Sequence, residues 1–184
     1  MLVNSLSRVS GDFEMSKNTL TQEQLKTHLL YEPTTGNFIW IDYPGGKRKY
    51  KGTIAGSLDL TNGYIHITLL GISYRAHRLA YLYMTGNFPP EGYIPEHINT
   101  DKADNSWNNL RLATALQNNY NASKSIRNTS GHKGISFDRK SKQWRVDINC
   151  NKVRYRYGYT TLEEAIVAVR LLREELHREF ANHG

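Results

Sequence analysis

The sequence predicts an α+β fold built from several small units, and three observations support this prediction. Short β-rich runs bounded by Gly, Asn or Pro recur along most of the chain. Three Ser/Thr-x-x-Glu/Gln patterns, which begin at Thr21, Thr114 and Thr161, are typical of helix N-termini. The length of 184 residues, of which 39% are hydrophobic, allows one medium domain or two to three small ones.

Turn signals and charge divide the chain into five predicted segments. They are a flexible tail over 1–15, a β-rich accessory region over 16–75, a central unit over 76–122, a linker over 123–130 and a C-terminal unit over 131–184. The tail has no hydrophobic periodicity, which is typical of segments that pack against nothing.

In the accessory region a short helix is expected to begin at Thr21. Its apolar face would consist of Leu25, Leu29 and Leu30. Strands are expected over 38–41, 64–69 and 72–75, and the last two form a hairpin across Gly71. The loop that follows the first strand carries four cations: Lys47, Arg48, Lys49 and Lys51. We interpret it as a phosphate-contacting loop, with a merely solvated loop as the alternative.

The central unit is predicted to be a helix, two strands joined by a long polar loop, and a second helix. The helix covers 77–85, the strands cover 93–97 and 110–112, and the second helix begins near Thr114, with Gln117 completing its capping box. The loop between the strands is rich in Asn and Asp, which favour tight turns.

The C-terminal unit is predicted to be a three-stranded antiparallel sheet covered by one helix. The strands cover 133–137, 143–148 and 153–157. The helix begins after Thr161 and carries an apolar stripe made of Leu162, Ala165, Ile166, Val169, Leu172, Leu176 and Phe180. We expect this stripe to form the core against the sheet.

The charge of the chain indicates a polyanionic partner. The formal net charge is +7; the stretch 131–156 carries +6 of it, whereas 91–130 is neutral. A neutral middle between basic ends is expected of a chemical site between two contacts with a phosphate backbone, and ordinary solvated surfaces are the alternative.

Composition excludes several classes of site. A single cysteine, Cys150, excludes an internal disulfide and every zinc site that needs two thiolates. The longest apolar run, 79–84, is far shorter than the roughly 20 residues of a membrane-spanning helix. We therefore expect a soluble intracellular protein that acts neither on membranes nor on a small molecule.

Glu96 and His97 bring a carboxylate and an imidazole together, and Asn109 and Asn118 follow them. Hydrolysis of a phosphodiester needs a base for the attacking water and a hard cation for the developing charge. If the two strands pair, the helix after them can return Asn118 to Glu96 over one cation. A purely polar loop is the alternative.

These residues lie in a segment that resembles the HNH endonucleases. The matching residues are Glu96-His97-Ile98-Asn99, Asp104-Asn105, Asn108-Asn109-Leu110-Arg111 and Gln117-Asn118, with Ala76-His77-Arg78-Leu79 similar to the preceding helix. The pattern is most similar to phage homing endonucleases of the His-Asn-Asn subtype. Separately, 128–184 resembles the AP2 DNA-binding domain through Asn128-Thr129-Ser130-Gly131, Trp144-Arg145-Val146 and Gly158-Tyr159.

The resemblance implies a ββα-metal core that cleaves double-stranded DNA at a specific site, by nicking. His97 matches the general base. Asn109 matches the residue that holds the loop and orients this histidine through a backbone contact. Glu96 and Asn118 match the ligands of one Mg²⁺ or Mn²⁺ ion. The family usually has Asp where this chain has Glu96. The alternative is therefore a sequence-specific DNA-binding protein with an inactive core. The resemblance also implies a phage-encoded protein in the bacterial cytoplasm, as a monomer or homodimer.

The AP2 resemblance implies further DNA contacts from the C-terminal sheet. They are Lys133, Ser136, Arg139, Trp144, Arg145, Arg154 and Arg156, and the HNH segment adds Arg78 and Arg111. Trp144 is equally well explained as a residue packed under the helix. Arg145 and Asp147 share a face, so part of this charge is expected to be paired. His77 is either a ligand or phosphate contact, or a structural histidine.

Overall fold

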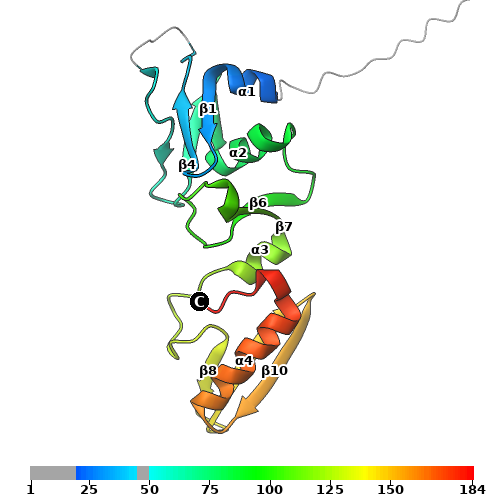
Figure 1. Cartoon of the computed structure of the whole chain (residues 1–184). Coiled ribbons are helices and arrows are strands. Elements are labelled where there is room, and N and C mark those ends of the chain that lie inside the picture. Colours follow the sequence, from blue (N-terminus) through cyan, green and yellow to red (C-terminus); the bar gives the residue numbers. More distant parts are fainter. Residues whose placement is uncertain (1–19, 45–49) are drawn as a thin grey trace, which may run out of the picture.

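The computed structural model describes residues 20–44 and 50–184. The predicted tail and Lys47, Arg48 and Lys49 lie outside these residues. Within them the fold is α+β, with four small antiparallel sheets rather than one continuous sheet. Figure 1 shows the N-terminal elements at one end, the C-terminal sheet at the other, and the hairpin of β6 (Tyr93–His97) and β7 (Leu110–Thr114) between them. No helix in 20–44 or 50–184 is long and apolar enough to cross a membrane.

The N-terminal region contains two small sheets and two helices. Its elements are α1 (Gln22–His28), β1 (Leu29–Glu32), β2 (Asn37–Trp40), β3 (Ser57–Leu58), β4 (Ile65–Leu69), β5 (Ile72–Arg75) and α2 (Ala76–Thr85). The hairpin predicted across Gly71 is present as β4 and β5, and Leu70 and Gly71 both have positive φ, of 51° and 80°. Such a pair of angles matches the tight turns that the strand twist favours.

The first predicted helix is shorter than expected. Thr21 caps it as predicted, but the helix ends at His28, and Leu29 and Leu30 belong to β1 instead of a helical face. Leu29 pairs with Trp40 of β2 and is fully buried, whereas Leu30 points outward. Pairing with a distant strand therefore decides the conformation of this segment over its local periodicity.

One hydrophobic core joins α1, the two N-terminal sheets and α2. Its fully buried members include Leu25, Phe38 and Leu69 from the first elements and Leu79 from α2. The helix α2 belongs to this core, although the sequence assigned it to the central unit. The core fixes α2 firmly, and α2 carries residues of the candidate site.

The central elements are β6 (Tyr93–His97), η2 (Trp107–Asn109), β7 (Leu110–Thr114) and α3 (Ala115–Asn121). The two strands are antiparallel, with Glu96 opposite Arg111 and His97 opposite Leu110. Thr114 and Gln117 form the predicted capping box at the start of α3. This local signal turns the chain from the second strand straight into the helix.

The C-terminal unit is a sheet of three antiparallel strands in the order β10–β9–β8. The strands are β8 (Ile135–Asp138), β9 (Gln143–Cys150) and β10 (Val153–Tyr159), followed by α4 (Leu162–His177) and η3 (Arg178–Phe180). Thr161 caps α4 as predicted, and α4 packs over Val146 and Ile148. Phe180 lies beyond the helix, in a separate cluster with Tyr120, so the predicted stripe ends earlier.

Candidate active site

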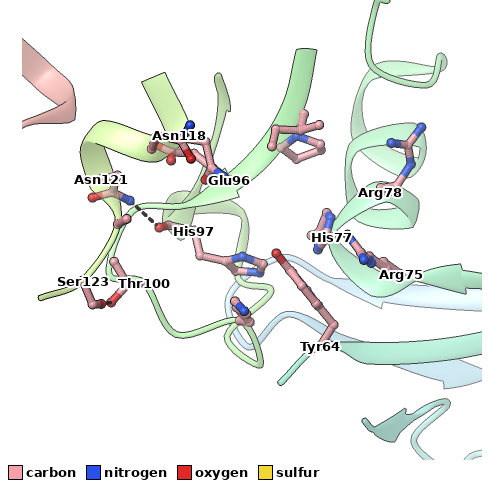
Figure 2. A pocket seen from close by; sticks show the side chains of 15 residues that line it. Tyr64, Arg75, His77, Arg78, Glu96, His97, Thr100, Asn118, Asn121 and Ser123 are labelled. Carbon is pink, nitrogen blue, oxygen red and sulfur yellow. Dashed lines mark hydrogen bonds between the residues drawn. The ribbon is translucent and has the colours of Figure 1, made fainter. Parts of the chain in front are cut away.

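A pocket of about 360 Å³ lies where α2, β6 and α3 meet. Figure 2 shows that its walls come from segments far apart in the sequence. The lining includes Tyr64, Arg75, His77, Arg78, Glu96, His97, Lys102, Asn118 and Asn121. Three of the four residues predicted for the chemistry, Glu96, His97 and Asn118, therefore share one cavity.

Glu96 is held at the inner side of the pocket. Its side chain is 1% exposed, and Oε1 accepts a hydrogen bond from Nε of Arg111. Oε2 is buried and has no hydrogen-bonding partner among the described residues. Burial raises the pKa of Glu96, while Arg111 and, less strongly, Asn121 oppose this shift. The carboxylate thus has one oxygen paired with Arg111 and one without a hydrogen-bonding partner.

His97 is buried beside Glu96, and its ring is oriented by Asn105. Nε2 of His97 lies 3.2 Å from Oδ1 of Asn105, whose amide nitrogen donates to the carbonyl of Ala103 at 3.0 Å. Because the amide orientation is fixed in this way, Nε2 carries the proton and Nδ1 keeps its lone pair. Burial lowers the pKa of His97, against the opposing effects of Asn105 and Asp104. A neutral ring can accept a proton at Nδ1.

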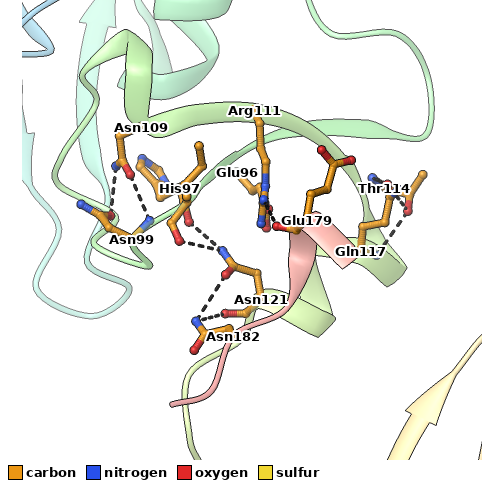
Figure 3. A network of polar contacts seen from close by, with 11 residues as sticks. Glu96, His97, Asn99, Asn109, Arg111, Thr114, Gln117, Asn121, Glu179 and Asn182 are labelled. Atoms are coloured by element: carbon orange, nitrogen blue, oxygen red, sulfur yellow. Dashed lines mark hydrogen bonds and ion pairs between the residues drawn. The ribbon is translucent and has the colours of Figure 1, made fainter. Parts of the chain in front are cut away.

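Asn109 holds the loop between β6 and β7, as Figure 3 shows. Its amide nitrogen donates to Oδ1 of Asn99 at 3.0 Å and to the carbonyl of Asp104 at 2.8 Å. Its Oδ1 accepts from the backbone N–H of Asn99 at 3.0 Å. The ring of His97 is contacted by Asn105. The backbone carbonyl of Asn109 accepts a hydrogen bond from the N–H of Ile98, next to His97, at 2.8 Å.

The C-terminal end of α3 also contacts the site. Asn121 is buried, and its amide nitrogen donates to the carbonyl of His97 at 2.8 Å. Asn118, one turn earlier, lines the pocket together with Glu96. Nothing in the sequence distinguishes Asn105 and Asn121 from the neighbouring asparagines, because their roles depend on partners in other elements.

Aromatic rings and cations form the opposite wall of the pocket. The rings of His77 and His97 are 5.1 Å apart and nearly perpendicular, and Tyr64 lies 5.1 Å from His77. Arg75 and Lys102 stand over the ring of Tyr64, at 4.3 Å and 4.9 Å from its centroid. Nδ1 of His77 is buried without a partner in the described part of the chain. Tyr64 and Arg75, which the sequence analysis missed, thus form part of the pocket.

The N-terminal region supports the polar loop from behind. The hydroxyl of Tyr31 donates to the carbonyl of Asn105 at 2.7 Å, and the N–H of Trp107 donates to the carbonyl of Pro33 at 2.8 Å. Gly36, at φ +74°, leaves no space for a side chain, since a Cβ there would lie 2.3 Å from the backbone of Asn105. The accessory region therefore fixes the residue that orients His97.

The polar groups of the pocket fit a hard divalent cation. Oε2 of Glu96, which has no hydrogen-bonding partner among the described residues, and the side-chain amide of Asn118 would supply oxygen ligands, the type that Mg²⁺ prefers, and Mg²⁺ keeps several waters of its own. Residues 20–44 and 50–184 contain no group of three His, Cys, Asp or Glu suited to a metal.

The structure divides the predicted DNA contacts into two groups. Ser136, Arg139, Arg154, Arg156 and Lys51 are exposed, and Arg145 is partly exposed on the outer face of the C-terminal sheet. Asp147 pairs with Arg154 and Arg156, the latter at 3.1 Å, and Asp138 pairs with Arg145, as the shared face predicted. Arg78 lines the active-site pocket.

The other three of the described residues, which are partly buried, make contacts within the protein, and for Trp144 this is the packing under the helix that was the alternative. Lys133 donates to the carbonyls of Tyr120, Ala122 and Asn182, and burial lowers its pKa to about 8. Trp144 packs against the cluster beneath α4. Arg111 is bonded to Glu96, so binding a phosphate would require breaking that ion pair.

Comparison with known proteins gives one matching family model and two relatives. A family model described as HNH endonuclease matches residues 74–120, from the end of β5 into α3. Protein 3.8 of Escherichia phage T7 is 32% identical over 92 residues, which are 50% of this chain and 76% of that protein. A protein of Acanthamoeba polyphaga mimivirus, named an uncharacterized HNH endonuclease, is 35% identical over 107 residues, 57% of this chain and 54% of that one. No solved structure matches the chain.

Proposed function

The chain belongs to the HNH endonuclease family and is a nuclease, and from this premise we propose that it hydrolyses double-stranded DNA with a divalent cation held by Glu96 and Asn118. The observation that carries the proposal is that one pocket contains two groups. One is the buried carboxylate of Glu96, in which one oxygen has no hydrogen-bonding partner, and the other is the imidazole of His97, which Asn105 orients. Such a pair supplies a cation ligand and a base at the same point.

His97 acts as the general base through Nδ1. Nε2 of His97 donates its proton in the hydrogen bond to Oδ1 of Asn105, so only Nδ1 can take a proton from a water molecule. The resulting hydroxide attacks phosphorus, and the bond to the leaving oxygen breaks. Burial lowers the pKa of the ring, which favours its unprotonated form before the reaction.

Glu96 and Asn118 would hold the cation, and the oxygen character of these ligands suits Mg²⁺ or Mn²⁺. When bound, such a cation stabilises the negative charge of the phosphate and of the leaving oxygen. Arg111 keeps one oxygen of Glu96 engaged, so the second oxygen remains directed to the ligand role.

The substrate backbone runs along the cationic wall of the pocket. Arg75 and Lys102 are exposed, flank Tyr64, and offer positive charge next to His97. Arg154 and Arg156 on the C-terminal sheet add a second DNA contact outside the pocket. Site-specific nicking of a homing type, and an AP2-like role for the C-terminal unit, are part of this proposal.

Replacement of His97 by Ala tests the assignment of the base. We expect plasmid nicking in Mg²⁺ to fall by roughly 10² to 10⁴-fold, because general base catalysis typically contributes that much. DNA binding, measured by fluorescence anisotropy in Ca²⁺, should stay nearly unchanged. His132→Ala, a histidine of the C-terminal unit, serves as the control and should cut like the wild type.

Chelation separates this proposal from a DNA-binding protein with an inactive core. The wild-type protein should nick supercoiled plasmid in Mg²⁺ or Mn²⁺ and stop when EDTA is added. Binding without cleavage in either cation would favour the inactive alternative, and undiminished cleavage by His97→Ala would remove His97 from its role.

A further inference from the structure

The segment after α4 returns from the C-terminal unit to the catalytic hairpin. Figure 1 shows the end of the chain lying between α3 and the C-terminal sheet. There the carbonyl of Glu179 accepts a hydrogen bond from Nη1 of Arg111, and the ring of Phe180 lies 4.1 Å from the Arg111 guanidinium carbon. Arg111 is therefore held by this segment on one side and by Glu96 on the other (Figure 3).

A second route leads from the same segment to His97. The side-chain amide of Asn182 donates to the carbonyl of Asn121 at 2.8 Å and to its Oδ1 at 3.3 Å. Asn121 in turn donates to the carbonyl of His97 at 2.8 Å. Glu96 and His97 are consecutive residues of β6. A single intervening side chain links each of them to the segment: Arg111 for Glu96 and Asn121 for His97.

The backbone of the segment is itself constrained. Arg178 has φ 51° and ψ −125°, a conformation that L-residues rarely adopt, and this turn redirects the chain from α4 toward the hairpin. Such a conformation persists only where surrounding contacts impose it. Here Phe180 is buried, at 5% exposed, and Lys133 joins the carbonyl of Asn182 to that of Tyr120 at the end of α3.

We propose that Arg178–Asn182 is a positioning element of the active site, which orients Glu96 through Arg111 and His97 through Asn121. The inference rests on the proposed function for its catalytic consequence, but the contacts themselves do not. It makes the C-terminal unit a part of the catalytic machinery as well as a DNA-contacting module. Residues of the segment are positioning residues, since none of them lines the pocket.

Two variants test the two routes separately. Asn182→Asp keeps the size of the side chain and replaces its donor by an acceptor that faces the oxygens of Asn121. Phe180→Leu keeps an apolar side chain and removes the ring under Arg111. Each should lower kcat roughly 10-fold, in the range found when residues behind catalytic ligands are replaced. KM for DNA should stay within about twofold, because the pocket walls are unchanged.

Amide hydrogen exchange supplies a readout that needs no cleavage. The N–H groups of Ile98 and Asn99 donate to the backbone carbonyl and Oδ1 of Asn109, at 2.8 Å and 3.0 Å. Both should exchange faster in Asn182→Asp if the segment holds this part of the hairpin. His183→Ala, whose side chain contacts Arg173 and Glu174 instead, is the matched control and should keep wild-type exchange and kcat.

The outcomes separate the two proposals. Unchanged exchange in Asn182→Asp, or variants whose kcat equals that of the wild type, would overturn the positioning role while leaving the nuclease assignment intact. A loss confined to KM would also overturn it, because the segment would then serve binding. If the wild type fails to cut in Mg²⁺ and Mn²⁺, the proposed function fails, and the exchange experiment still decides the inference. Asn182→Asp carries the test alone if Phe180→Leu lowers folding stability.

Discussion

Asn105 illustrates how one amide can determine the chemistry of a neighbouring ring. It is buried, accepts from Nε2 of His97, and is fixed in orientation by Ala103 and by the hydroxyl of Tyr31 on its backbone carbonyl. The nitrogen of His97 that carries the proton is therefore set by a residue eight positions away in the chain. Orientation by such a partner is as important to a base as its pKa.

Asn105→Ala is expected to lower kcat for DNA cleavage by about 10 to 100-fold, since the ring loses its orienting partner and its fixed tautomer. The measurement is single-turnover cleavage of a labelled duplex at saturating protein. Asn108→Ala, in the same loop and exposed, is the control and should cut at the wild-type rate. Equal rates for the two variants would contradict the orienting role of Asn105.

At the scale of elements, the two faces of the C-terminal sheet differ clearly, since one is apolar and the other is charged. Val146 and Ile148 point into the core beneath α4, whereas Arg154 and Arg156 lie on the outer face and share Asp147. The carboxylate lowers the self-repulsion of two adjacent cations in the free protein. Paired surface charges of this kind exchange readily for phosphate, because exposed ion pairs contribute little free energy.

Arg154→Ala should weaken DNA binding and reduce the slope of log K against log salt concentration by about 1, as expected for the loss of one phosphate contact. The measurement is anisotropy titration of a labelled duplex at several salt concentrations. An unchanged slope would argue against the sheet as a DNA contact.

Lys133→Met is the informative comparison for Arg154→Ala. Both residues are basic and belong to the same unit, but Lys133 satisfies three backbone carbonyls at the end of α3. Its replacement should lower the melting temperature and leave the salt slope unchanged. A reduced slope would instead return Lys133 to the group of DNA contacts.

At the scale of the whole molecule, folding and the candidate site are linked through buried histidine. Burial lowers the pKa of His77 from 6.5 to about 3, and electrostatic interactions with His97 and Arg75 add to this shift. The unfolded chain binds a proton at this residue near pH 6.5, but the folded chain does not until about pH 3. The contribution of the buried, neutral His77 to the free energy of unfolding is therefore fully present above pH 6.5, and it is lost as the pH falls toward 3.

The melting temperature of the wild-type protein should thus fall between pH 6.5 and pH 4, and fall less steeply in His77→Phe, which has no proton to bind. Differential scanning calorimetry across this range measures the difference. Leu79→Val, a core substitution on the same helix, should lower the melting temperature by a similar amount at every pH. Parallel curves for wild type and His77→Phe would contradict the linkage.

Local signals predicted many of the elements. The capping boxes at Thr21, Thr114 and Thr161 are all present, and strands β4 to β10 lie close to their expected positions. The failures involve partners that the local sequence does not contain. Leu29 joins a strand because Trp40 pairs with it, and Phe180 leaves the α4 stripe because the cluster around Tyr120 receives it.

The sequence by itself determined the class of the protein and the residues available for its chemistry. The HNH pattern, the capping boxes and the alternating strands depend on interactions between residues a few positions apart, and these can be recognised in one dimension. Only the tertiary structure decided that Asn105 contacts the ring of His97, that Lys133 donates to a carbonyl near the end of α3, and that Asn182 reaches Asn121. The physical reason is that burial and the choice of hydrogen-bonding partner depend on packing between distant segments, such as Tyr31 and Asn105, 74 positions apart.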